Sequence, residues 1–350
     1  MRGRWHNGTD KWVHINQIIK DQRIGVLALQ ETHLNKDNET VLNSTPGMRI
    51  HVTSSIDPSQ ANAKGVAIVM NKNLVNTSGV KTYDLVPGRA LLAVIPWRRD
   101  DTLKILAIYT PNDPQNNQYF WDLVHLKLRG LPKPDVMLGD FNLVEDALDR
   151  LPPKQDTHGP TSKLNELKSY LKLRDGWRAE HPDLLQYTFA QSAHQGRRQS
   201  RIDRIYIKDE LLPFSREWNI VPPGIHTDHQ LVTARVSSKK MPFVGSGRWS
   251  LPLFILKNKK LGEEIIELGK TLQSEVKSSS ATRTYISNPQ TAFSHFKTNA
   301  IELCRSTAKK LVPMKRNKLM TQLHATTNDP NLPDEDKCIK LQDMIKQETT

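Results

Sequence analysis

The sequence predicts an α+β fold: a four-layered sandwich in which two packed, mostly antiparallel β-sheets are flanked by helices, followed by a helical C-terminal extension. Two observations predict it. Short apolar runs mix with segments of helical periodicity without the strict strand–helix alternation of a parallel doubly wound sheet. Beyond residue 236 the strand-like runs stop, and helix-like segments follow.

The predicted strands are short runs rich in Val, Ile and Leu, which is typical of strands with a buried face. They are Ile24–Gln30, Gly65–Met70, Ala90–Ile95, Leu103–Tyr109, Val136–Leu138, Ile202–Ile207 and Gln230–Val236. Helical spacing of apolar residues predicts helices over 10–22, Gln118–Leu128 and Lys163–Leu173. These elements supply the inner sheets and the outer helices of the predicted sandwich.

A change in composition divides the chain near residue 238. Residues 237–247 are rich in Ser, Gly and Lys and form a predicted linker. Helices are expected over 263–279, 290–311 and 333–348. We therefore predict one domain over residues 1–237 and a basic, mainly helical region over residues 238–350.

The charge favours a polyanionic partner. The 350 residues carry a formal charge of +13, and residues 238–350 hold 19 Lys+Arg against 11 Asp+Glu, net +8. A basic surface attracts phosphate groups and releases counterions on binding. Charge alone does not decide for nucleic acid, because many basic proteins bind nothing specific.

The cysteine count and the hydropathy indicate the cellular compartment in which the protein is expected. Cys304 and Cys338 are the only cysteines, so no disulfide framework is expected and a reducing compartment is the simpler interpretation. No apolar run is long enough to span a membrane, and the N-terminus lacks the apolar core of a signal peptide. We expect an intracellular protein without a membrane partner; the sequence specifies no oligomeric state.

Polar residues stand at the ends of two predicted strands. Glu31 follows the first apolar run, and Asp140 and Asn142 follow Gly139 after the run Val136–Leu138. A carboxylate at a strand end can reach a cleft while its backbone stays rigid. Gly139 is expected to let the chain turn, so that Asp140 and Asn142 leave the strand together. Taken singly, Glu31 can equally mark a strand exit, and Gly139-Asp140 can be a plain turn.

Two acids and a histidine accompany the last two predicted strands. Asp203 alternates with the isoleucines of the run Ile202–Ile207, which predicts an inward carboxylate that needs a partner, for which a histidine is the obvious choice. Asp228 and His229 precede the last run. Neighbours in an extended chain point to opposite sides, so one can serve a metal and the other a phosphate. An isolated Asp-His pair is nevertheless common.

Together these residues form a set that can hydrolyse a phosphodiester. They offer hard oxygen ligands for a divalent cation, an acid that can activate water, and hydrogen-bonding groups for the developing negative charge. The absence of a Cys/His cluster argues against zinc, and the oxygen-rich set favours Mg²⁺ or Mn²⁺.

Five short motifs occur in a particular order along the chain. They are Gln30-Glu31-Thr32, Tyr109-Thr110-Pro111-Asn112, Gly139-Asp140-Phe141-Asn142, Ser200-Arg201-Ile202-Asp203 and Thr227-Asp228-His229. This series resembles the endonuclease/exonuclease/phosphatase superfamily, which includes DNase I, the abasic-site endonucleases and the endonucleases of non-LTR retrotransposons. The resemblance covers residues 1–237 and implies a DNase I-like sandwich.

The resemblance implies a role for each matching residue. Glu31 is similar to the metal-binding glutamate, with Asp228 near the same cation. Asp140 matches the acid that activates the attacking water, and Asn142 matches the amide beside it.

Further roles concern the phosphate and the nucleic acid. His229, paired with Asp203, is similar to the histidine that contacts the scissile phosphate. Tyr109 and Asn112 match the residues that line the phosphate pocket. Thr188, in the segment Tyr187-Thr188-Phe189, is expected beside a flipped or kinked nucleotide.

A basic loop has two interpretations from its residues alone. Arg197 and Arg198 lie in the loop Gln195–Gln199, which can meet a phosphate backbone or form a solvated hairpin tip.

Within the superfamily, the flanks resemble retrotransposon reading frames. Both Lys11–Leu34 and Gly247–Ser250 have this character, and in such polyproteins a reverse transcriptase follows. No Tyr-x-Asp-Asp element occurs, so residues 238–350 are expected to be the linker region that precedes a polymerase, without the polymerase itself. The resemblance implies a nuclear endonuclease whose partner is DNA.

One departure from the family lies at the front. Family members begin with an apolar strand that ends in a metal-site asparagine, and Met1–Arg4 resembles the segment that comes directly after that asparagine. We therefore expect the first strand to be missing. A central strand of about five buried apolar residues is worth roughly 8–15 kcal/mol, so folding and activity are expected to suffer.

Three functions remain open on the sequence. The first is a metal-dependent DNA endonuclease that nicks target DNA for retrotransposition. The second keeps the fold but acts on inositol phosphates or lipids, because a fold does not fix a substrate. The third is an inactive remnant that binds nucleic acid through its basic surface.

Overall fold

The computed structural model describes residues 5–6, 9–60, 64–97, 101–191, 198–225, 227–238, 251–278 and 283–328. The linker residues 239–247, the helix predicted over 333–348 and Arg197 lie outside this part. The described residues fall into two compact units, one up to residue 238 and the other from residue 251. Each unit is described by itself.

The three helices predicted for the first unit are confirmed. They are α1 (Lys11–Asp21), α3 (Pro114–Lys127) and α4 (His158–Leu171). Asp10 and Asp113 begin α1 and α3, because their side chains accept backbone N–H groups of the first turn. The sequence does not predict α2 (Lys36–Ser44) and α5 (Gly176–Glu180), which are short and hold few apolar residues.

The larger sheet has six strands in the order β11-β14-β9-β8-β7-β6. The strands are β6 (Lys81–Val86), β7 (Ala90–Pro96), β8 (Thr102–Tyr109), β9 (Val136–Asp140), β11 (Leu173–Asp175) and β14 (Asp203–Lys208). Neighbours are antiparallel except β8 and β9, which run parallel. The four predicted strands of this sheet are therefore confirmed, and the edge strands β6 and β11 are additional.

The second sheet of the sandwich is formed in two pieces. One has the order β3-β5-β4, with β3 (Val26–Gln30), β5 (Val66–Asn71) and β4 (Ile50–Ser55); the other pairs β15 (Ser215–Val221) with β16 (Leu231–Val236). In the described part of the chain, neither β3 nor β16 has a strand on its other edge.

An apolar groove separates β3 from β16. Its volume is about 490 Å³, and both strands line it. Its walls include Val26, Ala28, Val232, and from the larger sheet Leu138 and Ile205, all only partly buried. By contrast, every residue of β5 is buried. The sandwich is thus well packed around β5 and less closely packed between β3 and β16.

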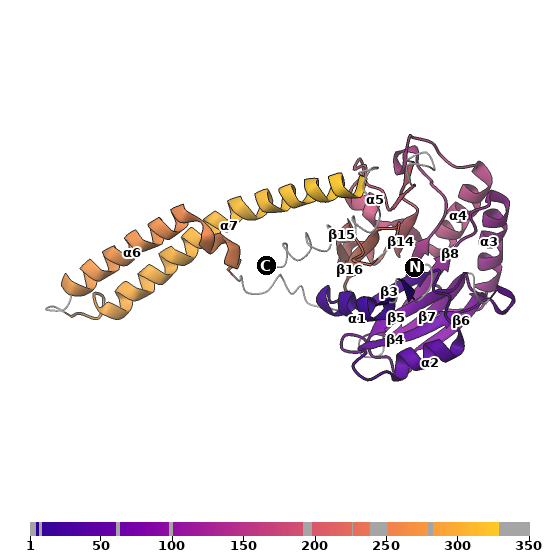
Figure 1. Cartoon of the computed structure of the whole chain (residues 1–350), viewed down its shortest axis with the longest axis horizontal. Helices are drawn as coiled ribbons and strands as arrows, with labels where there is room; N and C mark the ends of the chain where they lie inside the picture. The colour runs from indigo at the N-terminus through magenta and orange to yellow at the C-terminus, as the bar shows by residue number, and fades with distance from the viewer. Residues whose placement is uncertain are drawn as a thin grey trace. The chain divides into compact units, whose positions relative to one another are not determined.

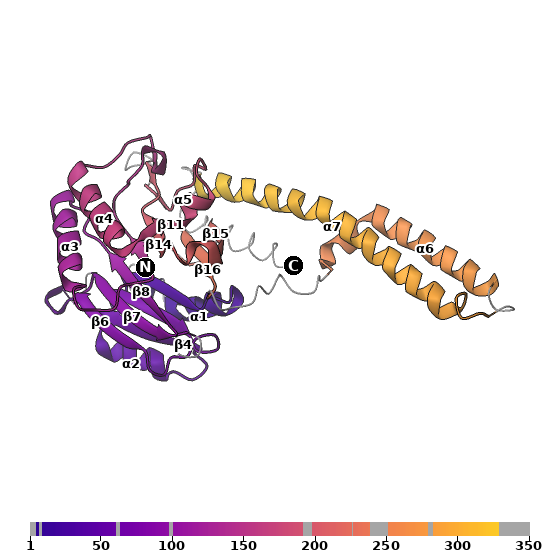
Figure 2. The same ribbon diagram turned by 180° about the vertical axis from the view of Figure 1, so that it is seen from behind.

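Three apolar cores hold the first unit together in four layers. Helices α3 and α4 pack on the outer face of the larger sheet through residues such as Trp121 and Leu164. The two sheets pack together through Ile68, Ala107 and their neighbours. Helices α1 and α2 cover the outer face of the second sheet, where Trp12 is fully buried. Figures 1 and 2 show α3 and α4 side by side, with α2 beyond β4. The predicted sandwich is confirmed.

Small elements complete the first unit. A three-stranded sheet has the order β10-β13-β12, with β10 (Arg150–Leu151), β13 (Gln199–Ser200) and β12 (Phe189–Ala190). A short hairpin pairs β1 (Trp5–His6) with β2 (Thr9–Asp10). Single 3-10 turns are η1 (Pro58–Gln60), η2 (Ala147–Asp149) and η4 (Leu212–Phe214).

The second unit is a helical hairpin. It contains η5 (Leu253–Lys257), α6 (Lys259–Ser278) and α7 (Pro289–Asn328), packed around Leu261 and Cys304. The helix predicted over 290–311 is confirmed, although α7 continues through Pro313. Among the described helices, none is both long enough and apolar enough to cross a membrane.

Candidate active site

Three polar residues stand in a row across the larger sheet. The strand register places Tyr109 of β8 beside Asp140 of β9, and Asp140 directly opposite Asp203 of β14. All three lie where the pairing of their strands ends. Residues far apart in the chain are thereby held at one level by backbone hydrogen bonds, which gives the side chains a rigid base.

Gly139 is needed for close packing of β9 against β8. It lies within β9 with φ +143°, and a Cβ atom there would come within 2.0 Å of the carbonyl oxygen of Ile108. The expectation that Gly139 turns the chain is therefore wrong. The left-handed residue is Asn142, with φ +46°, two residues after the strand end at Asp140.

Asp203 holds His229 by a hydrogen bond. The distance between His229 Nδ1 and Asp203 Oδ2 is 2.8 Å, so the predicted partner of the inward Asp203 is confirmed. Burial lowers the pKa of His229, but the charge and the hydrogen bond of Asp203 outweigh it and raise this pKa to about 9. His229 is therefore a cation at neutral pH.

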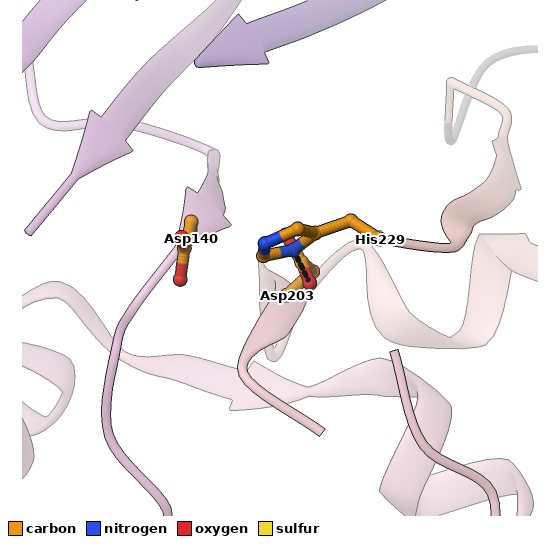
Figure 3. A group of neighbouring side chains, drawn as sticks. All are labelled: Asp140, Asp203 and His229. Atoms are coloured by element: carbon orange, nitrogen blue, oxygen red, sulfur yellow. Dashed lines mark hydrogen bonds and ion pairs between the residues drawn. The ribbon is translucent and has the colours of Figure 1, made fainter. Parts of the chain in front are cut away.

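Asp140 faces the same histidine from the other side. Figure 3 shows the imidazole of His229 beside the carboxylates of Asp140 and Asp203. Burial raises the pKa of Asp140, and the negative charge of Asp203 adds to this, so that the pKa reaches about 7. A carboxyl group that titrates near neutral pH is suited to accept a proton from water.

Glu31 extends from the second sheet toward the row of Tyr109, Asp140 and Asp203 on the larger sheet. It follows β3 with φ +53°, and its Oε1 accepts a hydrogen bond of 2.7 Å from the Tyr109 hydroxyl. Burial and this bond raise the pKa of Tyr109, so the tyrosine stays a neutral donor. The negative charge of Glu31 also raises the pKa of Asp140.

A cavity of about 670 Å³ collects most of the predicted site residues. Those that line it are Glu31, Tyr109, Asn112, Asp140, Asn142, Arg198, Asp203, Asp228 and His229. Its lining includes residues at or just after the ends of strands from both sheets, such as Glu31 after β3 and Asp140 at the end of β9. The structure therefore brings together residues from five separate motifs.

Two predicted residues differ from this group. Thr188 is fully buried, and its hydroxyl accepts hydrogen bonds from the backbone N–H groups of Ile202 and Asp203, each at 3.0 Å. This placement does not support the expected contact with a nucleotide. Arg197 lies outside the described residues, whereas its neighbour Arg198 is exposed at the rim of the cavity.

The donor set fits a divalent cation. Among the described residues, one group of acids and histidines has ligand atoms that all lie within 4.8 Å of one another: Asp140, Asp203 and His229. His229 is protonated, however, and a cation repels a metal ion. The carboxylates of Glu31 and Asp228 line the same cavity. Burial and then the negative charge of Asp203 raise the pKa of Asp140, and a hard cation bound by carboxylate oxygens would offset both effects.

Of the basic wall of the cavity, the sequence predicts only Arg198. Arg150, Lys154 and Arg198 lie along this wall. Arg150 makes two hydrogen bonds of 2.6 and 2.8 Å to the carboxylate of Asp156, which fixes its guanidinium. Arg150 belongs to β10, which pairs with β13, and no local pattern in the sequence indicates this pairing.

A buried ion-pair network supports the strand that carries Asp203. The guanidinium of Arg201 makes two 2.7 Å hydrogen bonds to Asp149, and both side chains are 2% exposed. Arg201 also pairs with Asp175 at 2.7 Å, and Arg178 pairs with Asp149. The network links η2, α5 and the start of β14.

The sandwich, the acid–histidine pair and the row of carboxylates define a hydrolase of the nuclease and phosphatase class with a DNase I-like fold. A family model confirms this class. Residues 7–240 match the Endonuclease/Exonuclease/phosphatase family, and the chain belongs to this family.

One curated relative comes from a transposon. The chain is 30% identical over 240 residues to the "Transposon TX1 uncharacterized 149 kDa protein" of Xenopus laevis. The match covers 66% of this chain and 17% of that protein, so the chain spans a small part of its relative.

Solved structures show the same fold at low identity. The endonuclease domain of TRAS1, a telomere-specific non-LTR retrotransposon, matches with TM-score 0.50 and 16% identity, covering 66% of this chain and 93% of that domain. The 3′ phosphatase NExo from Neisseria, bound to product DNA hairpin, matches with TM-score 0.52 and 19% identity, over 65% and 95%. An AP endonuclease from Archaeoglobus fulgidus has TM-score 0.52 and 16% identity, over 65% and 94%.

Proposed function

We propose that the chain is a divalent-metal-dependent endonuclease that nicks DNA. The observation that carries the proposal is the convergence of Asp140, Asp203, His229 and Glu31 in one cavity at the ends of strands from both sheets. A basic wall beside these acids suits a phosphate backbone. The similarity to transposon proteins supports DNA as the target and the nucleus as the place of action.

The residues divide the chemistry between them. Asp140 takes the proton from the attacking water, since its carboxyl group titrates near neutral pH. Protonated His229, oriented by Asp203 through Nδ1, donates a hydrogen bond from Nε2 to the negatively charged phosphate. Tyr109 remains protonated and adds a further donor.

Two further features complete the scheme. Asn142, whose side-chain amide is anchored by a 2.9 Å hydrogen bond to the carbonyl of Thr110, orients the phosphate beside Asp140. Glu31 and Asp228 would hold Mg²⁺ or Mn²⁺, which when bound polarises the phosphate and stabilises the leaving oxygen.

A phosphatase acting on smaller substrates is the second candidate, because one structural relative is a 3′ phosphatase. The two candidates differ in product. Supercoiled plasmid and a 3′-phosphorylated oligonucleotide are incubated separately with the full chain and Mg²⁺. Conversion of plasmid to open circles supports the endonuclease. Release of inorganic phosphate without nicking refutes it and supports the phosphatase.

A further inference from the structure

Thr188 makes hydrogen bonds with each of its polar groups. Its hydroxyl accepts from Ile202 N and Asp203 N, each at 3.0 Å, and donates to Ser200 O at 3.4 Å. Its own N–H donates to Ser200 O at 3.0 Å, and its carbonyl accepts from Gln230 N at 2.6 Å. Thr188, whose side chain is fully buried, is thus bonded to two segments of chain, to one through its hydroxyl and its N–H and to the other through its carbonyl.

The first segment carries Asp203. The neighbouring strand β11 pairs only with Tyr206–Lys208 of β14, so it does not extend along the Asp203 end. The N–H groups of Ile202 and Asp203 therefore lack a strand partner on that side. The Thr188 hydroxyl supplies the missing acceptor, and a buried N–H without an acceptor is costly.

The second segment carries His229. The backbone of Phe189 forms a β-bridge with His229, and the two rings lie 4.9 Å apart. Together with the bond from Gln230 to the Thr188 carbonyl, these contacts hold the chain on both sides of the imidazole. Two consecutive residues, Thr188 and Phe189, therefore contact both halves of the Asp203–His229 pair.

We infer that Thr188 is a positioning residue that sets the hydrogen bond between Asp203 and His229. This inference rests on the proposed function, in which that bond orients the imidazole toward the phosphate. Valine has the shape of threonine but offers no acceptor, so Thr188→Val leaves two buried N–H groups unsatisfied and frees the start of β14 to shift. Serine retains the hydroxyl, so Thr188→Ser should keep the hydrogen bonds from the N–H groups of Ile202 and Asp203.

The experiment compares Thr188→Val and Thr188→Ser in the full chain. Thr53→Val is the matched control, because among the described residues the buried hydroxyl of Thr53 has no hydrogen-bond partner. For Thr188→Val we expect kcat for plasmid nicking to fall roughly ten- to a hundredfold, as for a misplaced catalytic group, with KM nearly unchanged. Thr188→Ser should restore most of kcat, and Thr53→Val should match the wild type.

A second measurement does not depend on activity. The proton between His229 Nδ1 and Asp203 Oδ2 gives a low-field NMR resonance, which should broaden or move in Thr188→Val but not in Thr188→Ser or Thr53→Val. If Thr188→Val does not fold, Thr188→Ala, which leaves room for a water molecule, is measured in the same way.

The outcomes distinguish a failure of this inference about Thr188 from a failure of the proposed function. An unchanged resonance in the folded variants that lack the hydroxyl overturns the inference, whether or not they nick DNA. A wild-type kcat in these variants overturns it as well. Absence of nicking by the wild-type chain refutes the proposed function, and the resonance then still decides whether Thr188 positions the pair.

Discussion

Asp140 and Asp203 stand directly opposite each other on the antiparallel strands β9 and β14. Like charges in this arrangement destabilise a sheet. Protonated His229 lies beside both carboxylates and offsets part of the repulsion. Some repulsion between the two carboxylates therefore remains in the site, and a bound cation would reduce it.

Asp140→Asn should stabilise the metal-free protein. The amide removes one of two facing charges and no longer has to be ionised while buried, so the free energy of unfolding should rise by about 1 kcal/mol at pH 8 in EDTA. Urea denaturation measures it. Asp122→Asn, at an exposed carboxylate, serves as the control and should change little. A less stable Asp140→Asn protein would show that the facing carboxylates are not a source of strain.

The stability of the metal-free protein should fall as the pH rises. Both Asp140, with a pKa of about 7, and His229, with a pKa of about 9, have pKa values above those of the unfolded chain. The folded state therefore holds these protons more tightly, and the stability they contribute at low pH is lost between about pH 3.8 and 7 for Asp140 and between about pH 6.5 and 9 for His229. The Tm in EDTA should fall in these two ranges. In Asp140→Asn the lower step should vanish; its persistence would assign it to another group.

Glu31→Gln should weaken the binding of Mg²⁺. The variant loses one negative charge in the cavity but can still receive the hydrogen bond of Tyr109. We expect the Mg²⁺ affinity, measured by calorimetry, to fall roughly tenfold or more. Glu166→Gln, an exposed acid on α4, is the control and should bind as the wild type does. Equal affinities in the two variants would remove Glu31 from the metal site.

Asp149→Asn should destabilise the first unit strongly. The substitution removes one of the two carboxylates that pair with the buried guanidinium of Arg201, and breaking a buried pair in this way costs about 3–5 kcal/mol. Urea denaturation again measures the change. Asp122→Asn breaks an exposed pair with Lys163 and should cost about 0–1 kcal/mol. Similar losses in the two variants would mean that the network around Arg201 contributes no more than a surface pair.

Most of the strands that the sequence predicts have a nearly continuous apolar character. Strands β5, β7 and β8 lie in the middle of the sandwich, and their composition alone indicates them. Strands β4 and β6 border their sheets and mix polar with apolar residues. Their pairing is decided by neighbouring strands, which a local pattern does not contain.

In the site, too, the local sequence predicts some residues, whereas others are brought there only by tertiary contacts. Asp140, Asp203 and His229 could be selected because each lies beside an apolar strand. Arg150 could not, because its pairing in the small sheet brings it to the cavity. The role expected for Thr188 placed it near substrate, whereas folding buries it behind Asp203. Burial is a property of the whole domain and is not visible in three consecutive residues.

The nicking of supercoiled plasmid by the full chain tests the central claim most directly. The claim is that Asp140, with its neighbours in one cavity, hydrolyses phosphodiester bonds with the help of a divalent cation. We predict open circles in Mg²⁺, no product in EDTA, and a rate for Asp140→Ala lower by roughly 10²- to 10⁴-fold. Nicking by Asp140→Ala at the wild-type rate, or nicking that continues in EDTA, would contradict the claim.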